Sequence, residues 1–350
     1  MIRAEYLKFP LQFKRPSGTS RGILNSKDSW IIKLSDSENP QKMGFGECSV
    51  IPGLSYDDLN LLPEKIEEVV SEINSGRVLN VSDLSSFPAL QFALETAFLD
   101  FKEAEQGVLF NSDFTSGKDE MQINGLIWMG EHSFMKEQIE EKIKQGFKCI
   151  KLKIGAINFE EEIDLLKRIR KEYSSKDIEI RVDANGAFET KDALEKLKVL
   201  SDLDLHSIEQ PIKQGQIEEM RILCEQTPLP IALDEELIGV IGIDKREDLL
   251  SFVKPQYIIL KPSLVGGIYN SREWINLAKE LNIGWWITSA LESNIGLNAI
   301  AQWTYTLNNP LPQGLGTGQL FTNNIDSPLE LKGDRLRYSQ EKKWNFDQLW

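Results

Sequence analysis

Three acidic residues and three lysines stand at the ends of short apolar runs, in an arrangement that suggests chemistry. The acids are Asp183, Glu209 and Asp234, and the lysines are Lys151, Lys153 and Lys261. The runs recur about every 25 to 30 residues, the length of one strand, one helix and two short loops. A parallel barrel gathers the carboxyl ends of its strands on one face, where catalytic groups collect. The pattern therefore predicts an enzyme whose charged groups meet at one site with a metal.

The three carboxylates indicate the kind of metal. Carboxylates that are forced together repel one another unless they are protonated or neutralised by a cation. Oxygen-only ligation suits Mg²⁺ or Mn²⁺ and disfavours zinc, for which histidine or cysteine ligands are expected. A single acid at a strand end is more often a solvated loop residue. Three acids in register on successive strand–helix units reverse that preference and favour Mg²⁺, with Mn²⁺ as the alternative.

The lysines are candidates for proton transfer. Lys151 and Lys153 are two residues apart in one strand, so their side chains share a face about 7 Å apart at the backbone. We expect both to point into the barrel mouth, with Lys261 across the ring. A neighbouring ammonium and Mg²⁺ would lower the lysine pKa and make an amine base available. The alternative is that the lysines only pair with the carboxylates, although such a polar site is costly without a function.

Composition limits the class of protein and its partners. The 350 residues exceed a (β/α)8 barrel of about 250 residues, so a second unit is expected. A formal charge of −14 argues against nucleic acid and anionic membranes as partners. Cys48, Cys149 and Cys224 form no C-x-x-C motif, so neither zinc nor a disulfide framework is indicated. Without a signal-like start or a long apolar run, the expected location is the cytoplasm.

The ends of the chain differ in pattern from its middle. Residues 1 to about 115 predict an α+β domain, with strands over 1–14, 30–34 and 44–50 and polar turns between them. Helices are expected over 56–74, with Ser55 as N-cap, and over 88–106. We expect the tail after Thr322, with its short strands, to pack back on this domain.

From Met121 to about Leu315 the pattern alternates between strands and helices. The expected helices span 158–173, 190–201, 216–225, 245–252, 270–281 and 294–306. This alternation predicts a parallel sheet with helical crossovers.

The order of the motifs resembles the enolase superfamily, and within it the muconate-lactonizing subgroup. The motifs are Lys-x-Lys at 151–153, Asp-x-Asn at 183–185, Glu-Gln-Pro at 209–211, Asp-Glu at 234–235 and Lys-Pro at 261–262. The resemblance covers the whole chain. It implies an α/β fold: a modified TIM barrel of the (β/α)7β type over 116–319, under an α+β capping domain built from 1–115 and 320–350.

The resemblance also implies roles for individual residues. It assigns Asp183, Glu209 and Asp234 as Mg²⁺ ligands, and use of a lysine base with Mg²⁺ is a known trait of that superfamily. Lys153 is the expected base, and Lys261 its partner on the opposite side. The residues expected to contact the substrate or support the ligands are Lys151, Asn185, Glu235, Ser289, Gly316 and Thr317. Substrate walls are expected from Leu54, Tyr56 and the turn at 17–21, with the loops at 16–22 and 50–56 reaching the site.

Three activities in the subgroup share the lysine pair: muconate lactonization, epimerisation of dipeptides or N-acylamino acids, and dehydration to o-succinylbenzoate. The segments 44–55 and 289–297 resemble those of the dehydrating members. The segment 313–319 lacks the Asp-x-Asp with which dipeptide epimerases hold an ammonium group. We therefore expect Mg²⁺-dependent syn dehydration of a small anionic carboxylate, 2-succinyl-6-hydroxy-2,4-cyclohexadiene-1-carboxylate, in menaquinone biosynthesis. N-acylamino acid racemisation or dipeptide epimerisation is the alternative.

Two other classes of protein compete with this interpretation. A Schiff-base aldolase would also use an inward lysine, but it leaves three neighbouring carboxylates unexplained. A barrel that only binds a ligand would not need both lysines and all three acids. The sequence leaves the oligomeric state open.

Overall fold

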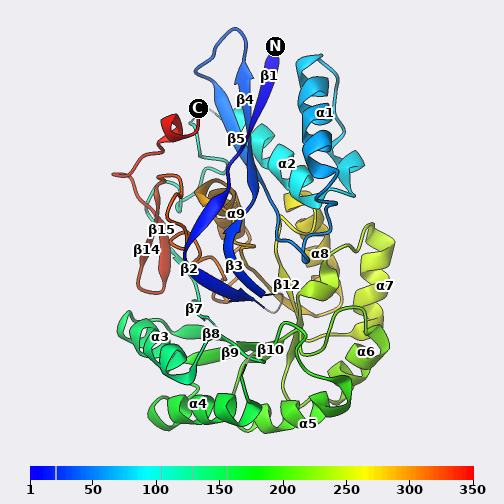
Figure 1. Ribbon diagram of the computed structural model, residues 1–350, viewed down its shortest axis with the longest axis vertical. Coiled ribbons are helices and arrows are strands. Elements are labelled where there is room, and N and C mark those ends of the chain that lie inside the picture. The colour runs from blue at the N-terminus through cyan, green and yellow to red at the C-terminus, as the bar shows by residue number, and fades with distance from the viewer. Residues whose placement is uncertain (20–21, 104, 129, 156) are drawn as a thin grey trace.

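The computed structural model covers the chain in two connected parts, a barrel and a cap (Figure 1). It describes residues 1–19, 22–103, 105–128, 130–155 and 157–350. In Figure 1 the helices α3 to α7 surround one end of the molecule, and β1, β4, β5, α1 and α2 form the other end. Among the described residues, no helix is both long and apolar enough to cross a membrane.

Seven parallel strands form the curved sheet of the barrel, in the order of the sequence. They are β7 (Gly125–Ile127), β8 (Cys149–Lys153), β9 (Glu179–Asp183), β10 (Ser207–Glu209), β11 (Ile231–Leu233), β12 (Tyr257–Leu260) and β13 (Gly284–Ile287). The helices that follow them are α3 (His132–Lys144), α4 (Phe159–Glu172), α5 (Thr190–Ser201), α6 (Ile217–Gln226), α7 (Ile243–Val253), α8 (Gly267–Glu280) and α9 (Asn294–Thr306). The expected α/β architecture with parallel strands is therefore confirmed.

A short segment at Gln313 and Gly314 joins the two edges of this sheet. Gln313 bridges Ile123 beside β7, and Gly314 bridges Thr288 beside β13, both in the parallel sense. The backbone N–H of Asn124 donates to the Gln313 carbonyl at 2.9 Å, and the N–H of Gly314 donates to the Ile287 carbonyl at 2.8 Å. These contacts close the ring in the eighth-strand position.

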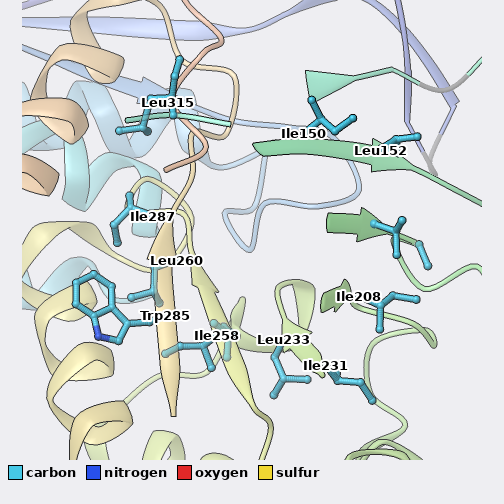
Figure 2. Packing of buried hydrophobic residues seen from close by; sticks show 14 of the residues in the cluster. Ile150, Leu152, Ile208, Ile231, Leu233, Ile258, Leu260, Trp285, Ile287 and Leu315 are labelled. Atoms are coloured by element: carbon cyan, nitrogen blue, oxygen red, sulfur yellow. The ribbon is translucent and has the colours of Figure 1, made fainter. Parts of the chain in front are cut away.

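Alternation along the strands separates the core from the site. On β8, Ile150 and Leu152 pack into the hydrophobic cluster between strands and helices (Figure 2), whereas Lys151 and Lys153 line the pocket at the barrel mouth. The barrel interior is filled lower down by a separate small cluster that contains Ala232, Ile259 and Trp286. The Arg181 guanidinium lies 4.3 Å from the centroid of the Trp286 ring. The barrel interior below the charged residues is thus filled by packed side chains and is not an open pore.

The cap consists of an antiparallel sheet against two helices. The strands are β1 (Ile2–Lys8), β4 (Ser29–Asp36) and β5 (Met43–Ser49), and the helices are α1 (Leu62–Asn74) and α2 (Pro88–Lys102). Gly44 and Gly46 let β5 approach the backbone of α2, because a Cβ on Gly46 would lie 1.8 Å from the Ala93 carbonyl oxygen. The hairpin of β2 (Leu11–Thr19) and β3 (Gly22–Lys27) extends from this sheet towards the barrel (Figure 1).

The tail contacts both parts of the molecule. Its strands β14 (Leu329–Lys332) and β15 (Arg335–Tyr338) pair with each other, and β15 also pairs with β6 (Met121–Gln122) at the start of the barrel. Further on, the ring of Phe346 stacks on Phe45 of the cap with centroids 4.1 Å apart. The division into a cap of 1–115 with 320–350 and a barrel of 116–319 stays a prediction.

Several expected element boundaries are wrong. Helix α1 begins at Leu62 rather than Tyr56, with Pro63 in its first turn, and Ser55 is not its N-cap. The Ser55 hydroxyl accepts the Ile51 N–H at 2.9 Å instead, so it shapes the preceding loop. Helix α2 ends at Lys102, four residues before the expected end at Gln106. Strand β3 and helix α3 were not expected from the sequence.

Candidate active site

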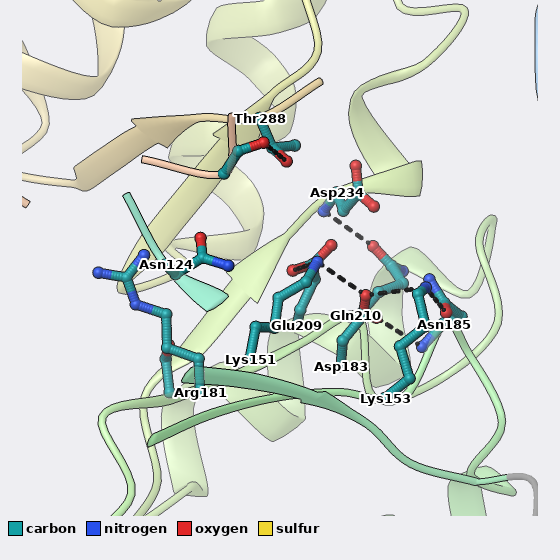
Figure 3. A network of polar contacts seen from close by, with 12 residues as sticks. Asn124, Lys151, Lys153, Arg181, Asp183, Asn185, Glu209, Gln210, Asp234 and Thr288 are labelled. Atoms are coloured by element: carbon teal, nitrogen blue, oxygen red, sulfur yellow. Dashed lines mark hydrogen bonds and ion pairs between the residues drawn. The ribbon is translucent and has the colours of Figure 1, made fainter. Parts of the chain in front are cut away.

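Strand register brings the predicted charged residues together. Lys153 on β8 pairs with Asp183 on β9, and Asp183 pairs with Glu209 on β10. Asp234 directly follows β11, and Lys261 directly follows β12. All these positions are at the carboxyl ends of adjacent parallel strands. Figure 3 shows five of these side chains gathered there: Lys151, Lys153, Asp183, Glu209 and Asp234.

The network pairs every predicted carboxylate with a lysine. The Lys151 Nζ donates to Asp183 Oδ2 at 2.9 Å and to Glu209 Oε2 at 2.8 Å. The Lys153 Nζ is 3.2 Å from the same Asp183 oxygen, and the Lys261 Nζ donates to Asp234 Oδ2. Asp183, Glu209 and Asp234 are only 1%, 2% and 1% exposed, so these charges depend on one another instead of on water.

Within the described part of the chain, no three His, Cys, Asp or Glu side chains form a group already arranged around a metal ion. The donor chemistry nevertheless fits a hard divalent cation. The Glu209 Oε1 atom is buried and has no hydrogen-bond partner among the residues that the structure describes. Burial and the neighbouring Asp183 raise the pKa of Glu209 to about 8, and burial also raises the pKa of Asp234. A cation beside these oxygens would supply the charge that they lack.

Lys151 is the lysine that contacts two of the predicted carboxylates, and these contacts determine its pKa. Burial alone would lower the pKa of Lys151, but the Asp183 and Glu209 carboxylates raise it above its ordinary value. Burial would raise the pKa of Asp183, but Lys151 and Lys153 hold it well below its usual range. At Lys151 the two nearby carboxylates outweigh the one neighbouring ammonium. The lowering of the lysine pKa that is expected beside Mg²⁺ stays a prediction.

Asn185 connects Lys153 to a second carboxylate. Its Oδ1 accepts from the Lys153 Nζ at 2.6 Å, and its Nδ2 donates to Glu235 Oε1 at 3.0 Å. The Asn185 backbone has a left-handed φ of 43°, a conformation that Asn tolerates better than most residues. Its own N–H donates to Asp183 Oδ1 at 3.1 Å. The Asp-x-Asn motif thus orients the acid and the lysine together.

Gln210 supports the turn that follows β11 and was not expected among the site residues. Its Oε1 accepts from the backbone N–H groups of Asp234 at 3.2 Å and Glu236 at 3.3 Å. Its Nε2 donates to Glu236 Oε2 at 3.1 Å. The side chain of Gln210 therefore ties the end of β10 to the turn that carries Asp234. The Glu-Gln-Pro motif was the signal that could have identified it.

A pocket of about 840 Å³, including its opening to solvent, lies beside this network. Lys151, Lys153, Asp183, Asn185, Glu235 and Lys261 line its polar side, and Ser289, Gly316 and Thr317 line it as well. Glu209 and Asp234 are not among the lining residues and lie beneath the others. The pocket walls that were not predicted come from Asn124, Leu126, Trp128, Thr288, Ala290, Leu291 and Gly314.

The cap contributes less of the pocket wall than expected. Leu54 lines the pocket, as does Ile51 from the same loop. Tyr56 is not among the described lining residues, because its ring packs beside Gly239 and is 48% exposed. Of the turn at 17–21, residues 20 and 21 lie outside the described residues. That the turn at 17–21 forms part of the pocket wall therefore stays a prediction.

Together, the barrel and its charged rim define an enzyme of the enolase type. A family model described as enolase C-terminal domain-like matches residues 134–341. The o-succinylbenzoate synthase of Desulfotalea psychrophila is 49% identical over 97% of this chain and 99% of its own length. The chain therefore belongs to the enolase superfamily, as its motifs indicated.

Solved structures agree with this membership. The crystal structure of MenC from Desulfotalea psychrophila has a TM-score of 0.86 and 44% identity, covering 96% of this chain and 99% of the other. The o-succinylbenzoate synthase of Bacillus subtilis is a more distant relative, at 29% identity over 84% of this chain and 81% of its length. A dipeptide epimerase from Enterococcus faecalis, crystallised with Mg and L-Leu-L-Tyr, has a TM-score of 0.81 at 22% identity and covers 97% of each chain. That likeness concerns the fold alone.

Proposed function

We propose that the protein is an o-succinylbenzoate synthase, a hydro-lyase of menaquinone biosynthesis. The observation that carries the proposal is the 49% identity to a protein of that name over nearly the full length of both chains. The pocket is consistent with the reaction, because it holds lysines on separate sides and has largely apolar walls. The substrate is a small carboxylate, 2-succinyl-6-hydroxy-2,4-cyclohexadiene-1-carboxylate.

Asp183, Glu209 and Asp234 would hold Mg²⁺, or Mn²⁺ in its place. Two observations support this assignment: the buried Glu209 Oε1 lacks a hydrogen-bond partner within the described part of the chain, and all the donors are oxygens. When bound, the cation supplies positive charge that lowers the cost of forming an enediolate from a carboxylate. The lysines that now contact these acids would then share them with the cation.

Lys153 is the residue for the proton transfers. Its Nζ, as the free amine, takes the proton from the carbon that carries the substrate carboxylate. The C–O bond to the hydroxyl group then breaks, and the same Nζ returns the proton to the departing oxygen as water leaves from the same face. The ring becomes aromatic. Asn185 supports this role because its Oδ1, 2.6 Å from the Nζ, fixes where the amine points.

Lys261 is the electrostatic partner. It follows β12, and β9, β10 and β11 separate this strand from β8, which carries Lys153. Burial alone would lower the pKa of Lys261, but Asp234 and Glu235 raise it above its ordinary value. An ammonium that keeps its proton is suited to stabilise negative charge on the substrate rather than to act as a base. The succinyl arm would lie towards Ser289 and Thr317, whose hydroxyl oxygens are 2.6 Å apart.

A racemase or epimerase is the second candidate, because lysines on opposite sides of a substrate can each exchange one proton. The deciding experiment incubates the purified protein and Mg²⁺ with the cyclohexadiene substrate and, separately, with N-succinylamino acids and dipeptides in D₂O. Dehydration of the first substrate at a rate far above deuterium uptake into the others supports the synthase. Deuterium uptake without dehydration would reject it.

A further inference from the structure

A buried lysine of the cap touches the wall of the pocket from outside. Lys27 ends β3 and is 2% exposed. Its Nζ donates to the Ala290 carbonyl at 3.0 Å, to the Leu291 carbonyl at 2.9 Å and to the Ser49 hydroxyl at 2.5 Å. An ammonium group has three N–H donors, so each of them is used. Two of the three go to the barrel segment that follows β13.

That segment has an unfavourable backbone conformation. Leu291 has a φ of 63°, in the left-handed region that a branched apolar residue rarely occupies. A conformation of this kind persists only where the surroundings impose it. Ala290 and Leu291 both line the pocket, so the strained turn is also part of the wall that faces the substrate.

Other hydrogen bonds fix the remaining groups of the segment. The N–H of Leu291 donates to the Ser289 hydroxyl at 3.0 Å, and the N–H of Ala290 donates to Glu292 Oε2 at 2.9 Å. The N–H of Ser293 donates to Glu47 Oε1 of the cap at 2.9 Å. These contacts hold the N–H groups, whereas Lys27 holds the two carbonyls at the strained position.

Two neighbouring acids, Glu292 and Glu47, oppose the positive charge of Lys27. Burial lowers the pKa of Lys27, while the neighbouring Glu292 and Glu47 act in the opposite direction. The Ser263 hydroxyl donates to Glu292 Oε1, and Ser263 is two residues after Lys261. The lysine, the strained turn and the strand end that carries Lys261 are thus linked through contacts in the structure.

We infer that Lys27 is a positioning residue, which holds the left-handed Ala290–Leu291 turn and so sets the pocket wall that selects the substrate. The inference rests on the proposed dehydration for its kinetic readout. Apolar contacts support the same assignment, because Ile51 and Leu54 of the cap pack with Leu264, Ala290 and Leu291. Lys27 contacts none of the predicted metal ligands.

The test compares Lys27→Met with Lys33→Met. Methionine keeps most of the length of the lysine chain and removes all three N–H donors. Lys33 is a matched control in the cap, because it pairs with Glu5 at 3.2 Å and lies over the Trp350 ring, away from the pocket. We expect Lys27→Met to raise KM about tenfold with kcat within about threefold, since Lys153 and its partners are untouched. Lys33→Met should leave both constants unchanged.

A suppressor separates positioning from general stability. Glycine adopts a φ of 63° without strain, so Leu291→Gly needs less help from Lys27. In the Leu291→Gly background, Lys27→Met should raise KM by no more than about threefold relative to Leu291→Gly alone. An undiminished tenfold effect in that background overturns the inference, as does a fall in kcat with unchanged KM. If Lys27→Met does not fold, Lys27→Gln replaces it in the test, because glutamine retains two N–H donors. Lys27→Gln should raise KM by a smaller factor. An unchanged KM in Lys27→Gln overturns the inference.

Hydrogen exchange gives a readout that does not need the substrate. Peptides that cover 289–293 should exchange faster in Lys27→Met than in the wild type, and Lys33→Met should match the wild type there. Unchanged exchange overturns the inference even if the enzyme dehydrates its substrate. A wild-type protein that fails to dehydrate the substrate rejects the proposed function, while the exchange result still decides the role of Lys27.

Discussion

The amine of Lys153 is held more closely by an amide than by a carboxylate: its Nζ lies 2.6 Å from Asn185 Oδ1 and 3.2 Å from Asp183 Oδ2. A neutral acceptor orients a lysine without stabilising its charged form as strongly as an anion does. Asn185 is in turn held by Glu235 through its Nδ2. Asn185, which directs the proposed base Lys153, also has a left-handed backbone φ.

Removal of the Asn185 amide should slow the chemical step. We expect Asn185→Gly and Asn185→Ala to lower kcat about tenfold or more, with smaller changes in KM, because the amine loses its direction. The two variants differ in backbone strain, because only glycine accepts a φ of 43° freely. The free energy of unfolding of Asn185→Ala should therefore be about 1 kcal/mol lower than that of Asn185→Gly. Steady-state kinetics and urea unfolding test this. A wild-type kcat in Asn185→Gly would contradict the role of the amide.

Arginine substitutions should distinguish the roles proposed for Lys153 and Lys261. Arginine remains charged and cannot act as a base near neutral pH. Lys153→Arg should therefore lose turnover, whereas Lys261→Arg should keep more activity than Lys261→Ala. The measurement is the dehydration rate of each variant at saturating Mg²⁺. Equal and complete loss in both arginine variants would instead indicate that Lys261 also transfers protons, which favours the racemase.

Metal removal should abolish activity reversibly. Treatment with a chelator should stop dehydration, and Mg²⁺ or Mn²⁺ should restore it. Loss of an outer-shell partner typically weakens metal binding about 10- to 100-fold. Glu209→Gln should raise the Mg²⁺ concentration for half-maximal activity by more than this range. Glu218→Gln is the control, because Glu218 is an exposed residue of α6 that pairs with Arg221. An identical Mg²⁺ dependence in Glu209→Gln and the control would remove Glu209 from the ligand set.

Asp57 should make the stability of the cap depend on pH. Burial raises the pKa of Asp57 to about 7, although its carboxylate accepts the Ala89 N–H at the start of α2. The folded state therefore binds the proton more tightly than the unfolded state, whose pKa is near the ordinary 3.8. Between these two values the contribution of Asp57 to the free energy of unfolding falls as pH rises.

Asn keeps an acceptor for the Ala89 N–H but does not titrate. Asp57→Asn should therefore gain stability relative to the wild type between about pH 4 and pH 7, with a constant difference above that range. Denaturant unfolding at several pH values measures the difference, in which the other titrating groups cancel. A difference that is independent of pH would show that Asp57 keeps an ordinary pKa in the folded protein.

Gly46→Ala should destabilise the cap severely. A Cβ there would lie 1.8 Å from the Ala93 carbonyl oxygen, so β5 and α2 must move apart. We expect a loss of more than about 2 kcal/mol in the free energy of unfolding. Gly76→Ala is the comparison: its φ of 79° is unfavourable for alanine, but its Cβ meets nothing, so the cost should be about 1 to 2 kcal/mol. Equal costs would show that the contact with α2 is easily relieved.

The sequence predicted the charged centre well because strand geometry determines it. A period of two residues along β8 places Lys151 and Lys153 on one face, and parallel register aligns Asp183 with Glu209. The apolar partners of the same strands, such as Ile150 and Leu152, face the helices for the same reason. Local pattern and tertiary position agree in this part of the chain.

Features that depend on distant partners could not be predicted. Ser55 has the type and position of an N-cap, but its hydroxyl accepts from Ile51, and Pro63 sets the start of α1 later. The pKa of Lys151 depends on two acids from other strands, whose combined effect no local pattern reveals. Lys27 has no motif at all, and its role emerges only from the contact between the cap and the turn at Leu291.

The closure of the barrel at Gln313 and Gly314 has a consequence for the order of folding. The outer edge of β7 is paired through Asn124 with a carbonyl that belongs to Gln313, far along the chain. While the ribosome is still making the intervening helices, that edge has no partner and exposes unpaired backbone groups. The ring can therefore close only late in synthesis, and chains that stall before Gln313 should be the ones that aggregate or require a chaperone.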